Sequence, residues 1–205
     1  HHEQRAAQKI AGHLAAGQSV ALVSDAGTPA ISDPGGRVVA ALRAEGWPVV
    51  AVPGACAAAA ALSIAGLTHA GGGWIFAGFL PTKTQERLRV LADWKSRASD
   101  DLALVFYEAP HRILDTIDAL SRHFGADRRI VIGRELSKLF EQIHRCALRD
   151  ARGWLEADAN HQKGEFVVLI EANTSSDDDG LSEARRILQI LLEEHPVSQA
   201  AALAA

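Results

Sequence analysis

The chain has 205 residues, of which 48% are hydrophobic, 22% are charged and 5% are aromatic. This composition is typical of an ordinary globular protein with one or two compact cores, and it excludes general disorder. The formal net charge of -4 is concentrated at the end of the chain: residues 173–205 hold six acidic and two basic side chains, whereas residues 1–172 hold nineteen of each. A neutral body argues against strong sequence-independent attraction to nucleic acid, although a local basic patch is compatible with it.

The sequence carries no membrane or secretion signal. It has no run of about eighteen uncharged apolar residues and no charged-then-apolar leader, so we expect a soluble, cytoplasmic protein without a membrane partner. Cys56 and Cys146 lack C-x-x-C spacing, which argues against a disulfide framework and a structural zinc site. His1 and His2 are left out of any site, because they could be natural or a tag remnant.

The first part of the chain is predicted to alternate helices with strands. Apolar periodicity predicts helices over residues 3–16, 35–45 and 55–65 and strands over residues 19–23 and 48–52. Gly17 and Gly46 fall where helix C-caps belong. Strands that alternate with helices and lack strict polar alternation predict a mainly parallel sheet covered on both faces.

The pattern resumes after the glycine run at residues 71–73, where we place a domain boundary. The expected strands are 74–78, 102–108, 129–136, 140–148 and 165–171, and the expected helices are 84–97, one opened by Pro110, and 148–159. Residues 173–180 have linker composition, and a helical module begins after them. We therefore expect an N-terminal α/β domain over 1–73, a C-terminal α/β domain over 74–172, and an acidic linker with the start of a helical module over 173–205.

Two segments of the first part have the composition and position of binding loops. SDAGTPAISDPG, residues 24–35, lies between a predicted strand and a helix, where an open parallel sheet presents a ligand crevice. PGACAAAAALSIAGL, residues 53–67, turns at Pro53 and Gly54 into a helix of small side chains whose N-terminus could hold a carboxylate or an adenine edge. A long loop with Asp33 as a helix cap, and an alanine helix that only packs closely, explain the same residues without a ligand.

The second domain gathers charged side chains at predicted strand ends, in FYEAPHRI (106–113) and GRELSKLFEQIHR (133–145). Arg112 and Arg134 could clamp phosphates, and Glu108 or Glu135 could orient an arginine or accept a proton from a hydroxyl. Ion pairs on a solvated rim explain the same charges equally well. Lys83, Lys163 and Glu165 join this group more weakly. The P-loop, dinucleotide-binding, serine-hydrolase and zinc-protease motifs are all missing.

Six segments, taken together and in this order, resemble the 16S ribosomal RNA cytidine 2'-O-methyltransferase family of the tetrapyrrole methylases. They are VSDAGTPAISDPG, PGACAAAAALSIAGL, GFLPTK, FYEAPHRI, GRELSKLFEQIH and KGEFVVLIE, and the match runs from about residue 3 to residue 171. The resemblance implies two α/β domains with S-adenosylmethionine in the cleft between them, and a homodimer. It also implies methyl transfer to a cytidine ribose 2'-hydroxyl of 16S rRNA in the small ribosomal subunit.

The resemblance also implies roles for particular residues. The expected cofactor-binding residues lie in two loops: Ser24, Asp25, Ala26, Gly27, Thr28 and Pro29, and Pro53, Gly54, Ala55, Cys56 and Ala57. Glu108 or Glu135 is expected to assist deprotonation of the hydroxyl, directly or through Lys138. Candidates for RNA contacts are Lys83, Arg112, Arg134 and Arg145. No metal is expected, because the chemistry requires none and no ligand cluster suggests one.

Members of this family begin with a strand and a GTPIGNL-type loop that helps build the cofactor pocket. Nothing in residues 1–20 corresponds to that loop, so we expect that the chain begins after it and that its own activity depends on the preceding segment. Two other functions remain open. One is a methylase of the same fold that acts on a tetrapyrrole or another small molecule, and the other is a non-catalytic dimeric scaffold that binds RNA.

Overall fold

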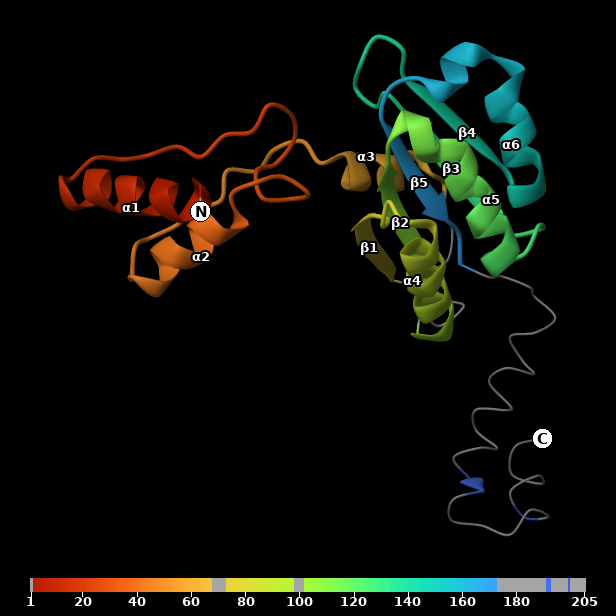
Figure 1. Ribbon diagram of the computed structural model, residues 1–205, viewed down its shortest axis with the longest axis horizontal. Helices are drawn as coiled ribbons and strands as arrows, with labels where there is room; N and C mark the ends of the chain where they lie inside the picture. Colours follow the sequence, from red (N-terminus) through yellow and green to blue (C-terminus); the bar gives the residue numbers. More distant parts are fainter. Residues whose placement is uncertain (1, 68–72, 98–101, 173–190, 193–198, 200–205) are drawn as a thin grey trace.

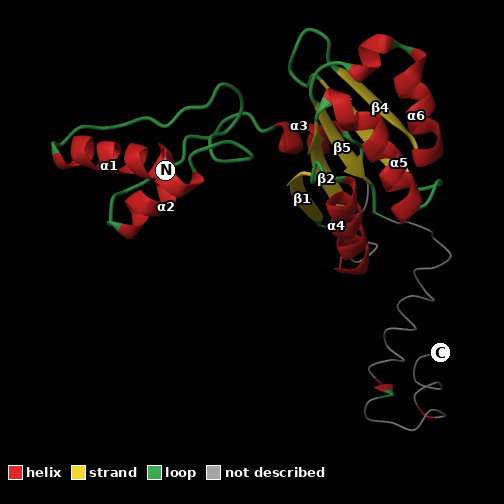
Figure 2. Ribbon diagram, in the orientation of Figure 1, coloured by secondary structure: helices red, strands yellow, loops and turns green. Residues whose placement is uncertain are grey.

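The computed structural model describes residues 2–67, 73–97, 102–172, 191–192 and 199. Figures 1 and 2 show a body built on one sheet, with the first two helices set apart from it. The helices are α1 (His2–Ala15), α2 (Gly36–Ala44), α3 (Ala57–Ile64), α4 (Thr84–Arg97), η1 (Pro110–Arg112), α5 (Ile113–Phe124), α6 (Leu148–Ala157) and η2 (Ala159–Gln162). The strands are β1 (Trp74–Phe79), β2 (Ala103–Glu108), β3 (Arg129–Arg134), β4 (Gln142–Ala147) and β5 (Phe166–Ile170). No helix in these ranges is long and apolar enough to span a membrane.

The sheet has the strand order β1-β2-β5-β3-β4. Only the β1–β2 pair is parallel, because β5 lies between β2 and β3 and pairs with both in the antiparallel sense, and β4 is antiparallel to β3. The expectation of a mainly parallel sheet is therefore wrong. The sequence could not reveal this, because a strand buried on both faces reads as a continuous apolar run whichever way it points.

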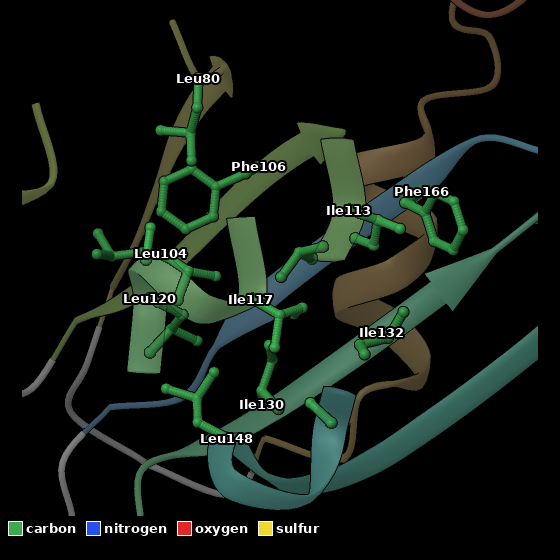
Figure 3. Close-up of a cluster of buried hydrophobic side chains, with 14 of the residues drawn as sticks. Leu80, Leu104, Phe106, Ile113, Ile117, Leu120, Ile130, Ile132, Leu148 and Phe166 are labelled. Carbon is green, nitrogen blue, oxygen red and sulfur yellow. The ribbon is translucent and has the colours of Figure 1, made fainter. Parts of the chain in front are cut away.

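Helices cover both faces of the sheet, as the strand composition predicted. Successive strand residues point to opposite faces, so Leu104, Phe106, Ile130 and Ile132 pack under α4, α5 and α6, and Figure 3 shows this cluster closing around Ile117 and Leu120. The other face carries Val105, Val131, Val167 and Leu169, which pack against Ala58, Ala61 and Ala65 in and just after α3. The sheet and the helices on its two faces form a three-layer body, in which the central strands β2, β5 and β3 are the most buried.

The first part of the chain folds differently from its prediction. Helices α1 and α2 confirm the two expected helices and share a small core of Ala7, Val38 and Leu42. The strands expected over residues 19–23 and 48–52 are absent from the described residues, and Val50 and Val52 are 83% and 84% exposed. Apolar β-formers become a strand only beside a hydrogen-bonding partner, and these two segments do not pair with each other in the structure.

The remaining expectations concern the end of the chain. The expected linker and helical module over residues 173–205 lie outside the described residues, apart from residues 191–192 and 199. The expected boundary at the glycine run stays a prediction. Helix α3, which precedes that run, packs on the sheet formed by the strands that follow it.

Candidate functional site

A cleft of about 360 Å³ opens where the loop over residues 24–35 and the start of α3 meet one end of the sheet. Its polar lining comes from both sides, and its floor is apolar. The lining residues are Ala26, Gly27, Thr28, Ile31, Ser32, Asp33, Cys56, Ala57, Phe79, Tyr107, Glu108, Ala109, Pro110, Glu135, Leu136, Lys138, Glu165, Phe166 and Val167.

The two predicted cofactor loops form one wall of this cleft. Thr28 Oγ1 donates a hydrogen bond of 2.9 Å to the carbonyl oxygen of Ala55, which ties the first loop to the second. Gly27 has a φ of 72°, and a Cβ added there would lie 3.5 Å from the same carbonyl oxygen. Close passage of the two backbones therefore suits a glycine at this position. Ser24 Oγ donates to the carbonyl oxygens of Ala26 and Gly27 and so holds the turn.

Five of the eleven predicted cofactor-binding residues line the cleft, namely Ala26, Gly27, Thr28, Cys56 and Ala57. The other six are not lining residues, namely Ser24, Asp25, Pro29, Pro53, Gly54 and Ala55. Ser24 and Ala55 nevertheless hold the wall in place through the hydrogen bonds described above. Both loops thus reach the cleft, and cofactor binding by these residues stays a prediction.

Backbone strain is concentrated in the loops that line the cleft. Ala30, Ser32, Glu135 and Ser137 are the non-glycine residues with positive φ in the described ranges, with values between 50° and 67°. Such conformations are uncommon for residues with a Cβ and tend to cluster at ligand sites, where surrounding contacts hold them. All four lie in the segments 30–32 and 135–137, one on each side of the cleft.

Tyr107, near the end of β2, fastens the start of α3 to the sheet. Its hydroxyl accepts a hydrogen bond of 3.1 Å from the backbone N–H of Ala58, and its ring meets Phe76 and Phe79 edge to face. Burial raises the pKa of Tyr107. One N–H of the first turn of α3 therefore binds this hydroxyl instead of a ligand, which modifies the expected anion site at the helix N-terminus.

Cys56 lies beside the same hydroxyl, with its Sγ 3.7 Å from the Tyr107 oxygen. Burial alone would raise the pKa of this thiol, but hydrogen bonds from the backbone at Ala59 and Ala58 and from Tyr107 lower it. The thiol is therefore a polar element of the cleft wall, not merely part of an alanine run.

Glu108 is buried at the back of the cleft and has partners on both carboxylate oxygens. Oε1 accepts from the Ala109 N–H at 2.8 Å and pairs with Arg112, while Oε2 accepts from Thr116 Oγ1 at 2.7 Å. Arg112 in turn donates to the carbonyl oxygen of Leu80 at 3.1 Å. This arrangement joins β2, α5 and the segment after β1, so Glu108 and Arg112 support the cleft from behind.

Glu135, Lys138 and Glu165 line the opposite wall and are bonded to one another. Lys138 Nζ donates to Glu135 Oε1 at 2.8 Å and to Glu165 Oε2 at 2.9 Å. The hydrogen bond to Glu135 and then that to Glu165 raise the pKa of Lys138. The hydrogen bond from Lys138, followed by that from the Glu165 N–H, lowers the pKa of Glu135. This charged cluster is thus an ammonium fixed between two carboxylates.

The candidates for RNA contacts are not brought together. Arg134 is only 5% exposed and donates to Gln142 and to the Lys163 carbonyl oxygen. Arg145 forms a bidentate pair with Glu171, beyond the end of β5 that lies away from the cleft, and this hydrogen bonding raises its pKa. Lys83 is exposed, lies 3.3 Å from Glu86 and is not a lining residue.

Sequence reasoning missed the apolar floor of the cleft. Phe79 ends β1, and Phe166 and Val167 begin β5. In the sequence, these three residues cannot be distinguished from apolar strand residues that only pack in the core. Their only signal is their position at strand ends, which requires the strand order that the sequence did not reveal. Among the residues that the structure describes, no group of three or more His, Cys, Asp or Glu side chains could hold a metal ion.

Comparisons with known proteins agree with this architecture. Residues 1–152 match the family model described as Tetrapyrrole (Corrin/Porphyrin) Methylases, and residues 178–205 match the RsmI C-terminal HTH domain. The solved methyltransferase CobJ superposes with a TM-score of 0.59 at 22% identity, covering 81% of this chain and 70% of that chain. Uroporphyrin-III C-methyl transferase from Thermus thermophilus, complexed with S-adenyl homocysteine, has a TM-score of 0.50 at 21% identity and covers 82% and 73%.

The fold is therefore that of the tetrapyrrole methylases. A relative named ribosomal RNA small subunit methyltransferase I from Pseudomonas aeruginosa is 44% identical over all of this chain and 72% of its own length. Within the tetrapyrrole methylases, the chain belongs to the ribosomal RNA small subunit methyltransferase I family. The resemblance inferred from six sequence segments is confirmed, and so is the expected fold class.

Proposed function

We propose that this chain uses S-adenosylmethionine to methylate the 2'-hydroxyl of a cytidine ribose in 16S rRNA. The observation that carries the proposal is the cleft, in which the two cofactor-type loops face the Glu135–Lys138 pair across an apolar floor. Family membership supplies the ribosomal RNA substrate class.

The cleft fits the cofactor. Its volume of about 360 Å³ lies within the range that holds a drug-sized ligand, and its lining of apolar side chains with a few polar groups is typical of small-molecule sites. Ala26, Gly27, Thr28, Cys56 and Ala57 would hold the cofactor on the loop side. When bound there, the cofactor supplies an electrophilic methyl group.

The protein's own contribution is then orientation and proton handling. Alignment of the ribose oxygen with the bound methyl group provides much of the acceleration. Lys138 is protonated and can stabilise negative charge that develops on that oxygen, while Glu135 holds Lys138 in place. Glu108 has both oxygens engaged and serves to position Arg112 and the end of β2.

We further propose that the chain acts in the cytoplasm as a homodimer. Each chain of this dimer is proposed to have two α/β domains that are divided near residue 73. Leu139 and Phe140 support the dimer, because they are 89% and 67% exposed next to Ile143 on the edge strand β4. Exposed apolar groups of this kind are typical of protein interfaces. Lys83 is the most exposed of the RNA-contact candidates, with 78% of its side chain exposed, whereas Arg112 and Arg134 support the fold around the cleft.

The proposal is tested by incubating the purified chain with labelled S-adenosylmethionine and small ribosomal subunits that lack the modification. We expect 2'-O-methylcytidine in the nuclease digest of 16S rRNA, identified by mass spectrometry. Transfer to a tetrapyrrole with none to the subunit would instead favour the small-molecule methylase. Binding to the subunit without transfer to either acceptor would favour the scaffold.

A further inference from the structure

Glu135 and Glu165, which lie on one wall of the cleft, are held together by hydrogen bonds and close packing. The two residues bridge through their backbones, because the Glu135 N–H donates to the Glu165 carbonyl oxygen at 2.9 Å. Glu135 Oε1 accepts the Glu165 N–H at 2.9 Å. A Cβ on Gly164 would lie 2.5 to 2.6 Å from three side-chain atoms of Glu135, so only a glycine leaves room for this carboxylate. The backbone of Glu165 is therefore fixed at the rim of the cleft.

Although the backbone of Glu165 is held in place, its side chain is open to solvent. It is 79% exposed, it lines the cleft, and it uses Oε2 to accept from Lys138. Its other oxygen points to no partner among the contacts described for this wall. Glu165 can therefore accept a further hydrogen bond from a ligand without giving up its contact with the ammonium.

The other carboxylates of the cleft are less suited to accept a proton. Glu108 is buried with both oxygens engaged. Glu135 receives two N–H donors on Oε1, is packed over Gly164, and has only 17% of its side chain exposed against 79% for Glu165. Asp33 lies on the cofactor-loop wall and forms no ion pair with any described residue, so it has no cation beside it to stabilise an alkoxide-like oxygen. Lys138 is already protonated.

We propose that Glu165 is the general base of the methyl transfer, with Lys138 as the cation that pairs with it. This inference rests on the proposed function and deepens it. The hydroxyl O–H bond breaks as the proton passes to the free oxygen of Glu165, the oxygen–methyl bond forms, and the methyl–sulfur bond breaks with its electron pair remaining on sulfur. The proton then leaves Glu165 for solvent, so atoms and charge balance.

The test compares Glu165→Gln with the parent chain, because an amide keeps the shape and can still accept from Lys138 but cannot take a proton. We expect kcat on small ribosomal subunits to fall roughly 100-fold or more, the usual contribution of a general base. Calorimetric binding of S-adenosylmethionine is expected to stay within about threefold of the parent, since the proposed role begins after the cofactor binds. Raising the pH is expected to restore the variant more than the parent, because hydroxide can replace the missing base.

Two matched variants separate this role from others. Glu156→Gln, on the exposed surface of α6 away from the cleft, is expected to leave kcat unchanged. Asp33→Asn is expected to cost much less than Glu165→Gln, and a larger loss there would overturn the assignment. A parent-like kcat in Glu165→Gln would also overturn the assignment of Glu165 as the base, and so would a loss of cofactor affinity as large as the loss of rate. Neither result would contradict the proposal that the chain methylates RNA. A parent chain that binds cofactor but methylates no RNA would instead remove the proposed function, and this inference with it.

Discussion

Gly164 is a single residue on which the arrangement of the cleft wall depends. Its φ is 90°, and an added Cβ would overlap the side chain of Glu135. We expect Gly164→Ala to destabilise the chain by about 1 kcal/mol for the backbone conformation alone, and by more once Glu135 is displaced. Urea denaturation measures the loss, and calorimetry should show weakened cofactor binding.

Gly153→Ala is the matched control for this prediction. Gly153 lies within α6, and a Cβ there would meet nothing within 4 Å. Alanine is a better helix former than glycine, so the free energy of unfolding of this variant is expected to rise by roughly 0.5 to 1 kcal/mol. Equal effects at the two glycines would show that the contact with Glu135 is unimportant.

A second residue-scale feature is the stack of His144, Trp154 and His161. The ring of Trp154 lies between the two imidazoles, with centroid distances of 4.3 and 4.2 Å. Burial, and then the neighbouring His161, lower the pKa of His144. The folded chain therefore binds a proton at His144 less readily than the unfolded chain does.

The sign of the pH effect follows from this lowered pKa. The contribution of His144 to stability is complete above its ordinary value of about 6.5 and is lost as the pH falls through the folded-state pKa. His144→Phe keeps an aromatic ring on Trp154 but cannot titrate. We expect the melting temperature of the parent to fall more steeply than that of the variant between about pH 7.5 and about pH 5. Parallel curves would assign the acid sensitivity to other groups.

At the scale of elements, α3 depends on small side chains. Ala61 is buried against the sheet, whereas its neighbour Ala60 is exposed on the same helix. Valine lowers helix propensity equally at both positions, but at residue 61 it also overpacks the interface, which typically costs about 1 to 3 kcal/mol. We expect Ala61→Val to be clearly less stable than Ala60→Val in thermal unfolding, and equal losses would show that α3 is loosely packed.

The elements differed in how well the sequence predicted them. Helices α1, α2, α4 and α5 were found because their apolar periodicity reflects one buried face, and β2 and β5 were found as apolar runs bounded by polar residues. Residues 19–23 have the same composition and form no strand. A segment forms a strand only if it pairs with a partner strand, which can be far away in the sequence. The local amino-acid sequence does not show whether such a partner is present.

The site shows the same division between local and non-local information. The loop at residues 24–35 was found because its position after an apolar run and its glycine and proline content are local properties. The sequence left open whether Glu108 orients an arginine or accepts a proton, because its burial behind Arg112 and Thr116 depends on how α5 packs against β2. Glu165 was only weakly marked, since its importance arises from contact with Lys138 across 27 positions of sequence.

At the scale of the whole molecule, the cleft joins parts that are distant in the chain. Its walls come from residues 26–33, from the start of α3, from the end of β2, from residues 135–138 and from the start of β5. A ligand that touches all of these binds only the folded chain, so S-adenosylmethionine at about 100 times its Kd is expected to add about 2.7 kcal/mol of stability. Differential scanning fluorimetry with increasing cofactor tests this, with ATP as the control ligand. An unchanged melting temperature at saturating cofactor would contradict it.

The order of the strands has a consequence for how the chain is made. Strand β5 is the last described strand in sequence but lies at the centre of the sheet, between β2 and β3. While the ribosome is still translating the codons before residue 166, no strand joins β2 to β3, and the backbone edges that β5 will cover are open templates for other chains. The nascent chain must therefore remain incompletely folded until β5 leaves the exit tunnel. Chaperones that bind apolar segments should engage it most strongly in that interval and release it once β5 is inserted.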